Sequence, residues 1–599
     1  MRVKVTKSKN AESFYVIKSV RLENGKTTSA VVEKLGTRES IQEMIGVDKD
    51  VEQWARDRAA ELTEQEKEQK RTVKVEYSPA KRIDAGERRL YDGGYLFLQD
   101  ILHSLGISSA CKSIEGRYRF EYDLESILTR LVYGRILDPS SKRSTCAFAQ
   151  GLIEAPGFKE HQVYRSLEVL AKESEFIQSE LYKNSQKAFG RKSGVLYYDC
   201  TNYFFEIEQE DELRRYGLSK EHRPTPIVQM GLFMDAEGIP LAFCIHPGNA
   251  SEQITMTPLE QKIIDDFGIS KFVTCTDAGL SSLANRRFNV QDSRQFITTQ
   301  SVKKLKGHLQ TWALDTKGWS ARGRKGTFDL EQVIASYEGE DTKEAAKAAL
   351  RNLTFYKSRM VREKDAKSEN GYFEQQLIVT FSLKHRDYQQ SIRAGQIERA
   401  IRAMGSDGSR MERKGANDFR RLCKKTSVTE DGEIAESDVW SIDEARIAKE
   451  ARFDGFYALC TSFENEDIEM LLKVNARRWE IEECFRIMKT EFKARPVYLS
   501  RKDRIRAHFL TCFIALLVYR LLEKQLKSEF TCEQIIDTLR DMKFEKVRNE
   551  GYRPMYEPNE ITNALHDSFG FRTDYEILST ASMRKIIRQT KKMKNSTTK

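Results

Sequence analysis

Residues 194–205 read GVLYYDCTNYFF, and residues 271–277 read KFVTCTD. Both stretches are rich in β-branched and aromatic residues, a composition that predicts strands. Each also carries one carboxylate: Asp199 lies inside the first apolar run, and Asp277 ends the second. Burying a carboxylate in an apolar strand is costly unless a partner compensates its charge. The two stretches therefore point both to a sheet and to a possible site.

The residues around these two strands predict a sheet that alternates with helices. Two further strand-like runs, IVQMGLFM and IPLAFCIHPG, follow the first strand and are joined by a turn at 235–238. The second strand is followed by the helical stretch SSLANRRFN and by a short strand, QFITTQ. The predicted order is therefore three strands, a helical stretch, a strand, a helix and a strand, which indicates that strands and helices alternate along this part of the chain.

The flanking regions differ in character. Residues 14–35 predict a hairpin, because two β-rich runs flank Asn24-Gly25, a favoured tight-turn pair. Residues 50–75 are highly charged and predict an exposed helix or linker. Residues 88–190 show helical periodicity, whereas residues 305–453 are charged and mixed and interrupt the strand–helix pattern.

The last part of the chain resumes the apolar pattern. A strand-like run at 454–462 precedes a predicted long helix from about Asp467 to Phe492. The most apolar run, 509–522, is too short to span a bilayer and contains an arginine, so we expect a buried helix there. The chain ends in a basic tail.

The composition indicates a soluble, charge-rich globular protein. The chain has 599 residues, 39% hydrophobic and 32% charged, with a net charge of +10 that permits a nucleic-acid partner without demonstrating one. Its ten cysteines form no C-x-x-C pair and no zinc-finger spacing, which indicates reduced thiols of an intracellular protein. The basic start is not followed by an apolar core, so we expect no signal peptide, no membrane role and a cytoplasmic location.

The predicted helix around Glu482 places a carboxylate between two cations. At about 100° per residue, Arg478, Glu482, Phe485 and Lys489 fall within roughly 60° of one another. A solvated salt-bridge ladder would explain this stripe. A carboxylate that holds a metal, with cations directed at phosphates, would explain it equally well.

A basic segment follows this helix. Between Arg486 and His508 there are eight cations and two anions, a local net charge of +6. Such a segment can neutralise several phosphates, although a solvated basic face is the alternative. Because Mg²⁺ prefers carboxylate oxygens, Asp199, Asp277 and Glu482 beside this segment suggest a metal site that acts on nucleic acid.

These motifs resemble the DDE transposases of bacterial insertion sequences, in the subgroup with a Tyr-x2-Arg-x3-Glu-x6-Lys (YREK) signature. Arg478, Glu482 and Lys489 fit the spacing of this signature, and Asn475 stands at the tyrosine position. The family associates that tyrosine with the DNA end near the active site, so its role is open here. YYDCTNYFFE, IVQMGLFMDAEGIPL, TDAGLSS and ARPVYLSRKDRIRAHFLTCFIAL also match the family in the same order, so the resemblance covers about residues 88–525.

The resemblance implies an α/β fold with a ribonuclease H-like mixed sheet flanked by helices, a β-rich insertion domain and a separate N-terminal region. We accordingly expect six segments: an N-terminal β-hairpin region with a charged helix or linker (1–87), a helical region that binds DNA ends (88–190), the first part of the catalytic domain (191–304), the insertion domain (305–453), the second part of the catalytic domain (454–525), and a C-terminal helical region with a basic tail (526–599).

The resemblance also implies the site. Asp199, Asp277 and Glu482 are expected to be catalytic and to hold Mg²⁺ or Mn²⁺, two ions per active site. The residues expected to bind DNA are Arg478, Lys489, Asn475, Arg486 and Lys493. In relatives a tryptophan of the insertion stacks on a flipped base. Trp312, Trp319 and Trp440 are candidates here, although core burial is the commoner role of such residues.

The implied activity is cut-and-paste DNA transposition. The chain would bind terminal inverted repeats, cleave a strand, pass through a hairpin intermediate and transfer the end to target DNA, as a homodimer in a synaptic complex near the bacterial nucleoid. The alternatives are a domesticated, non-catalytic DNA-binding protein and a ribonuclease H-like nuclease without strand transfer. A third is a protein with structural acids whose basic segment binds RNA.

Overall fold

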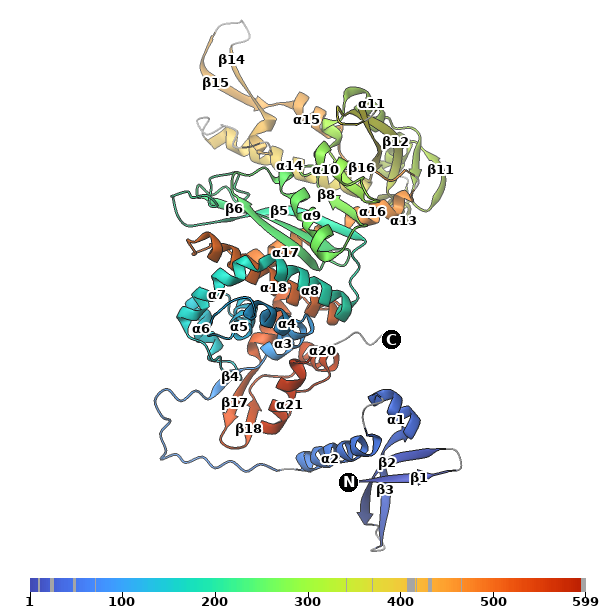
Figure 1. Cartoon of the computed structure of the whole chain (residues 1–599). Coiled ribbons are helices and arrows are strands. Elements are labelled where there is room, and N and C mark those ends of the chain that lie inside the picture. The colour runs from blue at the N-terminus through green and yellow to red at the C-terminus, as the bar shows by residue number, and fades with distance from the viewer. Residues whose placement is uncertain are drawn as a thin grey trace. The chain divides into compact units, whose positions relative to one another are not determined.

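The structure is a computed structural model that describes residues 1–8, 11–21, 26–46, 50–70, 72–340, 342–368, 370–406, 415, 417–428, 434–464 and 466–593. It divides into two compact units, Met1–Glu87 and Arg88–Lys599 (Figure 1). Each unit has a hydrophobic core of its own, so each is described by itself.

The first unit is a three-stranded antiparallel sheet with two helices. Its elements are β1 (Arg2–Lys7), β2 (Glu12–Arg21), β3 (Thr27–Thr37), α1 (Arg38–Ile45) and α2 (Val51–Lys70). The β2–β3 pair confirms the predicted hairpin, whose Asn24-Gly25 turn lies outside the described residues. The charged helix is confirmed by α2, which packs Val51 and Ala55 into the core of this unit.

A large mixed sheet lies at the centre of the second unit. β5 (Val195–Phe204), β6 (Ile227–Asp235) and β7 (Pro240–Pro247) are antiparallel neighbours. β8 (Val273–Thr276) runs parallel to β5, and β9 (Gln295–Gln300) runs parallel to β8. The predicted order of strands is confirmed.

Residues 305–453 were expected to form an insertion domain, but most of their strands extend the same sheet. These strands are β10 (Trp319–Ala321), β11 (Arg324–Phe328), β12 (Phe355–Lys364) and β13 (Tyr372–Phe381). The connection is made by β16 (Phe456–Thr461), which pairs with β13 on one side and β9 on the other. The ten strands are therefore ordered β11-β10-β12-β13-β16-β9-β8-β5-β6-β7.

A hairpin and a set of helices complete this region. The hairpin β14 (Cys423–Val428) and β15 (Ile434–Ile442) forms a sheet of its own and projects from the unit (Figure 1). The helices are α9 (Met256–Phe267), α10 (Leu283–Phe288), α11 (Gly307–Leu314), α12 (Leu330–Glu338), α13 (Glu344–Arg351), α14 (Leu383–Ser406) and α15 (Glu444–Ala451).

The predicted helical region and the predicted buried helix form one helical layer. α18 (Lys502–Gln525) packs against α3, α5 and α7 (Figure 1). It is long and apolar enough to cross a membrane, yet 94% of its most apolar window is buried inside the protein. The helices of residues 88–190 are α3 (Tyr95–Ser104), α4 (Ile107–Glu115), α5 (Leu124–Leu137), α6 (Lys142–Ala149), α7 (Glu160–Lys172) and α8 (Ser174–Phe189).

Two sequence predictions about the last third of the chain were wrong. The single helix over 467–492 is two helices, α16 (Ile468–Ala476) and α17 (Trp479–Lys489). The C-terminal region is not only helical, because short strands join β4 in a four-stranded sheet. These elements are β4 (Leu90–Asp92), α19 (Cys532–Asp541), β17 (Lys543–Val547), β18 (Gly551–Pro554), α20 (Glu560–Phe569), β19 (Leu578–Ser579) and α21 (Thr580–Thr590). All ten cysteines are free.

The turn between β6 and β7 is tied to the helix that carries Glu482. Gly238 has a φ of 75°, and its carbonyl accepts a 2.9 Å hydrogen bond from Arg520 Nε. Arg520 also pairs with Glu480 of α17 at 3.2 Å. A Cβ at Gly238 would overlap the side chains of both Glu480 and Arg520.

We therefore expect Gly238→Ala to lower the free energy of unfolding by about 2–4 kcal/mol, because it combines a left-handed φ with a steric clash. Gly190→Ala is the matched control, since Gly190 has a φ of 59° but nothing within 4 Å of an added Cβ. It should cost only about 1 kcal/mol. Urea denaturation of both variants measures the difference, and equal losses would contradict the role of the turn.

Candidate functional site

Asp199 of β5 and Asp277, the residue that follows β8, lie near each other because β5 and β8 are neighbouring parallel strands. Tyr197 of β5 is in register with Cys275 of β8, and two further residues along each strand bring the two aspartates to the same level. Burial raises the pKa of Asp199 to about 6, nearby Lys220 and Arg478 oppose this rise, and the negative charge of Asp277 adds to it. The structure therefore brings two of the predicted catalytic carboxylates together with one predicted cation.

The residues next to Asp199 on β5 fix its surroundings. The side chains of Tyr197, Asp199 and Thr201 share one face of the strand. The Tyr197 hydroxyl donates to the carbonyl of Val474 at 2.8 Å, and Lys489 Nζ donates to Thr201 Oγ1 at 2.6 Å. Asp199 thus lies on the face of the sheet that α16 and α17 cover.

Asp277 sits at the start of the loop after β8. The backbone amides of Gly279 and Leu280 donate to its Oδ1 at 2.9 and 3.0 Å, and Thr298 Oγ1 donates to its backbone carbonyl at 3.1 Å. These bonds hold the carboxylate at the carboxyl end of its strand. An aspartate that accepts amides two and three residues ahead is also an ordinary turn former.

Glu482 lies on α17 but remains exposed. Its neighbour Glu480 is buried against Arg520, and two residues correspond to about 200° around a helix, so Glu482 faces away from α18. In sequence, Glu482 lies between Arg478, whose positive charge lowers the pKa of Asp199, and Lys489, which donates a hydrogen bond to Thr201. Among the described residues no three His, Cys, Asp or Glu side chains form a group that could hold a metal.

Asn475 is placed beside the strand that leads to Asp277. Its Nδ2 donates to the Tyr457 hydroxyl at 3.1 Å, and its Oδ1 lies 3.9 Å from Cys275 Sγ. It also accepts, through its backbone carbonyl, the amide of Arg478 at 3.2 Å. This tight turn is where the predicted long helix is interrupted.

Arg486 and Lys493 lie further from the aspartates. Arg486 is paired with Glu483 at 2.7 Å and with Glu491 at 3.2 Å, which neutralises much of its charge. Lys493 is exposed and has a φ of 44°. The structure does not bring these two cations to Asp199 or Asp277.

Sequence reasoning missed Lys220 and Glu221, in the loop between β5 and β6. Lys220 Nζ donates to the carbonyl of Cys200, and Glu221 pairs with Lys489 at 3.0 Å and with Arg495. Asn202 of β5 holds the loop, accepting the Lys220 amide at 3.3 Å. The sequence of this charged loop has no spacing pattern from which its proximity to Asp199 could have been predicted.

The three tryptophans have different environments. Trp319 is fully buried, which confirms core burial for this residue. Trp312 and Trp440 are half-buried. Trp312 lies near two cations, with Lys357 Nζ 5.1 Å and Arg359 Cζ 5.2 Å from its ring.

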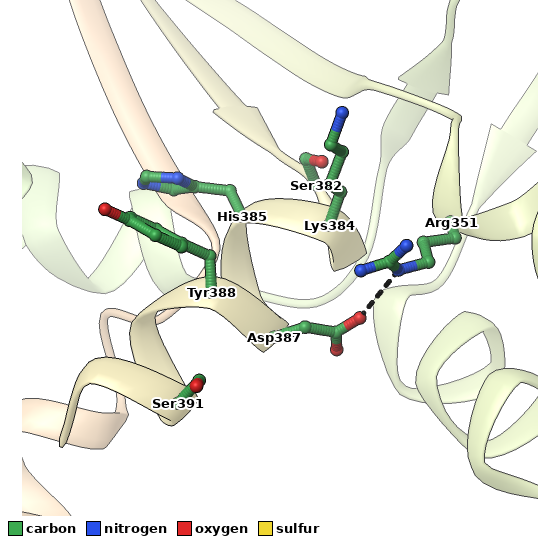
Figure 2. A pocket seen from close by; sticks show the side chains of 7 residues that line it. All are labelled: Arg351, Ser382, Lys384, His385, Asp387, Tyr388 and Ser391. Carbon is green, nitrogen blue, oxygen red and sulfur yellow. Dashed lines mark hydrogen bonds and ion pairs between the residues drawn. The ribbon is translucent and has the colours of Figure 1, made fainter. Parts of the chain in front are cut away.

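A hollow of about 610 Å³ lies at the start of α14 (Figure 2). Arg351 and Asp387 form a 3.0 Å ion pair at its edge, while His385 and Tyr388 stack beside each other. Its lining residues are Arg351, Ser382, Lys384, His385, Asp387, Tyr388 and Ser391. None of the predicted site residues is among them, so this hollow is separate from the aspartate pair.

No protein-family model and no curated protein matches the sequence. Among solved structures, the chain is similar to a piggyBac transposase, determined by cryo-EM as a synaptic complex with hairpin DNA. The TM-score is 0.34 and the identity 8%, over 82% of this chain and 86% of that chain. This score is too low to establish a shared fold, so the function is argued from the site.

The raised pKa of Asp199 predicts a stability difference. The folded state disfavours the ionised carboxylate of Asp199, so ionisation lowers the free energy of unfolding. This loss of stability begins as the pH rises above about 4, and it reaches its full size above about 6. Asp199→Asn removes that charge and keeps the oxygen that accepts the Cys200 amide. In EDTA at pH 7.5 this variant should be more stable than the wild type, by up to about 3 kcal/mol.

Thermal melts at several pH values measure this difference, which should shrink as the pH falls toward 4. The same melts with Mg²⁺ form the second arm, in which the wild type should gain stability and Asp199→Asn should not. A variant that is no more stable than the wild type at pH 7.5 would contradict a strained carboxylate pair.

Proposed function

We propose that the chain is a DNA transposase of the acidic-triad (DDE) type, similar to the insertion-sequence enzymes with the YREK signature. The observation that carries this proposal is the Asp199–Asp277 pair on adjacent parallel strands, with Lys220 and Arg478 close enough to lower the pKa of Asp199. Two adjacent carboxylates flanked by cations suit a reaction on a phosphodiester.

The strand arrangement supports a ribonuclease H-like sheet for this site. β7, β6 and β5 are antiparallel, and β8 and β9 then follow β5 in parallel. Asp199 lies in the central strand of these five, Asp277 ends its neighbour, and α17 packs against β5. This arrangement of Asp199, Asp277 and α17 supports the proposal that they form the acidic site of such a sheet.

The donor set suits Mg²⁺ or Mn²⁺. Asp199 and Asp277 offer hard oxygen ligands, and the negative charge of Asp277 raises the pKa of Asp199. Glu482 of α17 would be the third ligand. When bound, two divalent ions would stabilise charge on the attacking and leaving oxygens. Lys220 and Arg478 would contribute positive charge at the same phosphate.

In the proposed reaction, water attacks the scissile phosphorus and releases a 3′-OH at the end of the element. That 3′-OH attacks the opposite strand to form a hairpin, which is reopened, and then attacks a phosphodiester of the target. The attack by water and the reopening of the hairpin are hydrolyses, each of which leaves a 3′-OH and a 5′-phosphate. Each attack by a 3′-OH exchanges one phosphodiester bond for another and releases a new 3′-OH on the strand that is cut, so no covalent link to the protein is needed.

The basic segment after α17 would bind the flanking DNA. Several of its cations are paired with carboxylates in the structure: Lys489 and Arg495 with Glu221, Arg501 with Glu168, and Lys502 with Glu212. DNA phosphates would replace these carboxylates, which makes binding dependent on salt. We further propose a bacterial, cytoplasmic homodimer that joins two element ends, with residues 88–190 contributing to DNA-end binding.

Asp199→Ala, Asp277→Ala and Glu482→Gln should each reduce strand cleavage by at least about a thousandfold, because each removes a proposed ligand of the divalent ions at the reacting phosphate. The substrates are duplexes and plasmids that carry the DNA found on either side of the coding sequence. End binding, measured by mobility shift, should survive in all three variants. Arg486→Ala is the control, since its charge is already paired away from the aspartates.

The same assay separates the alternatives. Cleavage without joining to a target plasmid would indicate a nuclease, and end binding without cleavage by the wild type would indicate a domesticated binding protein. Preferential binding of RNA would favour structural acids with an RNA-binding segment. Normal cleavage by one of the three variants would remove that residue from the site.

A further inference from the structure

The sheet of the first unit has two chemically different faces. Along β2 the side chains alternate, and Phe14 and Val16 are fully buried on the side of the helices. The opposite side, here called the open face, consists of Ser13, Tyr15, Ile17, Ser19 and Arg21 of β2 together with the residues of β1 and β3 that are in register with them, and Ile17 at its centre is buried by its neighbours. The core of this unit lies on the helix side.

The open face is cationic and rich in hydroxyl groups. Its four cations are Arg2, Lys4, Arg21 and Lys34, and all four side chains are exposed. Serine, threonine and tyrosine residues from the three strands surround them, and none of the described residues of this face carries a carboxylate. Hydroxyl and basic side chains are the groups that most often contact DNA phosphates.

The acidic residues of the sheet are on the other side, where they are neutralised. Glu12 pairs with Lys7 at 2.6 Å and with Arg38 at 2.8 Å, and Glu33 pairs with Arg58 at 3.1 Å. The first unit therefore separates its charges by face, although it contains many acids and cations overall. The positive charges of the open face are therefore exposed and are not neutralised by these acidic residues.

One row of the open face shows the pattern most clearly. Lys4 of β1 lies opposite Tyr15 of β2, and Tyr15 lies opposite Lys34 of β3. Within the part of the chain that the structure describes, neither lysine has a carboxylate partner. Two lysines that flank a tyrosine across three strands can bind two phosphates while the phenol contacts a base edge or the backbone between them.

We propose that the open face is a second DNA-binding surface, which lies along the major groove of double-stranded DNA. Three strands spaced by about 4.8 Å give a backbone width of about 10 Å. The major groove is about 12 Å wide, and β-sheet readers use strands in this way. The two helices of the first unit pack on the other side of its sheet, so they do not cover the open face.

The choice of DNA as partner rests on the proposed function, but the two claims involve different residues. The first unit is joined to the second through residues 71–89, whose described part contains no helix or strand. Contacts by this unit would hold the element end, while cleavage would depend on Asp199 and Asp277. The open face can therefore be tested by binding alone.

The experiment uses the full chain and fluorescence anisotropy with a 30-base-pair duplex of generic sequence and with duplexes of the flanking DNA, at 50 to 300 mM KCl. Lys4→Ala/Lys34→Ala should reduce the slope of log K against log salt by about 1.8, from about 0.9 for each lost phosphate contact. At 0.1 M salt its Kd should rise at least about tenfold. Lys7→Ala/Lys67→Ala is the matched control, because both lysines are exposed but paired with Glu12 and Glu64.

Circular dichroism and melting of both double variants show whether the fold is retained. An unchanged slope and Kd in Lys4→Ala/Lys34→Ala overturns the proposal, as does an equal loss in the control. Tighter binding of single-stranded RNA than of duplex DNA, lost in the same variant, also overturns it in favour of an RNA surface. Cleavage that does not depend on Asp199 would overturn the proposed function but leave a changed binding slope as support for the open face.

Discussion

The burial of the Asp199 carboxylate within an otherwise apolar strand is the constraint on which the proposed site depends. β5 and β8 are paired in register up to Tyr197 and Cys275, and two residues further on Asp199 and Asp277 are close enough for their charges to interact. Burial raises the pKa of Asp199, and the charge of Asp277 raises it further. A sheet that keeps this strain needs a compensating charge, which Lys220 and Arg478 supply in part and which a divalent cation would complete.

The position of α17 follows from a second buried interaction. Glu480 is held by Arg520 and Arg477, and Arg520 also binds the carbonyl of Gly238. This network turns one side of α17 toward α18, while Arg478 lies near Asp199 and Lys489 contacts Thr201 of the same strand. The interruption between α16 and α17 belongs to the same arrangement, because it lets Asn475 pack beside Cys275 while Glu480 reaches Arg520.

Much of this arrangement could be predicted from the sequence because it is local. β-branched runs defined β5 to β9, apolar periodicity defined α3 to α8, and a carboxylate within an apolar strand marked Asp199. The long-range pairings could not be predicted. Nothing in residues 305–453 shows that β13 will pair with β16, and β17 to β19 are too short to give a strand signal.

The candidate site, too, could be predicted from the sequence only where it depends on local structure. Helical spacing could relate Glu482 to Lys489 because both lie on α17, whereas Arg478 immediately precedes that helix. Lys220 and Glu221 were missed because their proximity to Asp199 depends on how Asn202 folds a loop back onto β5. Arg486 fitted the basic pattern equally well, yet Glu483 and Glu491 hold it elsewhere.

The most direct test of the account is the metal dependence of cleavage by Asp277→Cys. A thiolate is a softer ligand than a carboxylate and binds Mg²⁺ poorly. If Asp277 holds the divalent cation at the scissile phosphate, the variant should lose cleavage of the flanking DNA in Mg²⁺ and recover part of it in Mn²⁺, while the wild type is active in both. Full activity in Mg²⁺, or an equal loss in both metals by a variant that remains folded, would contradict a metal-binding role for the aspartate pair.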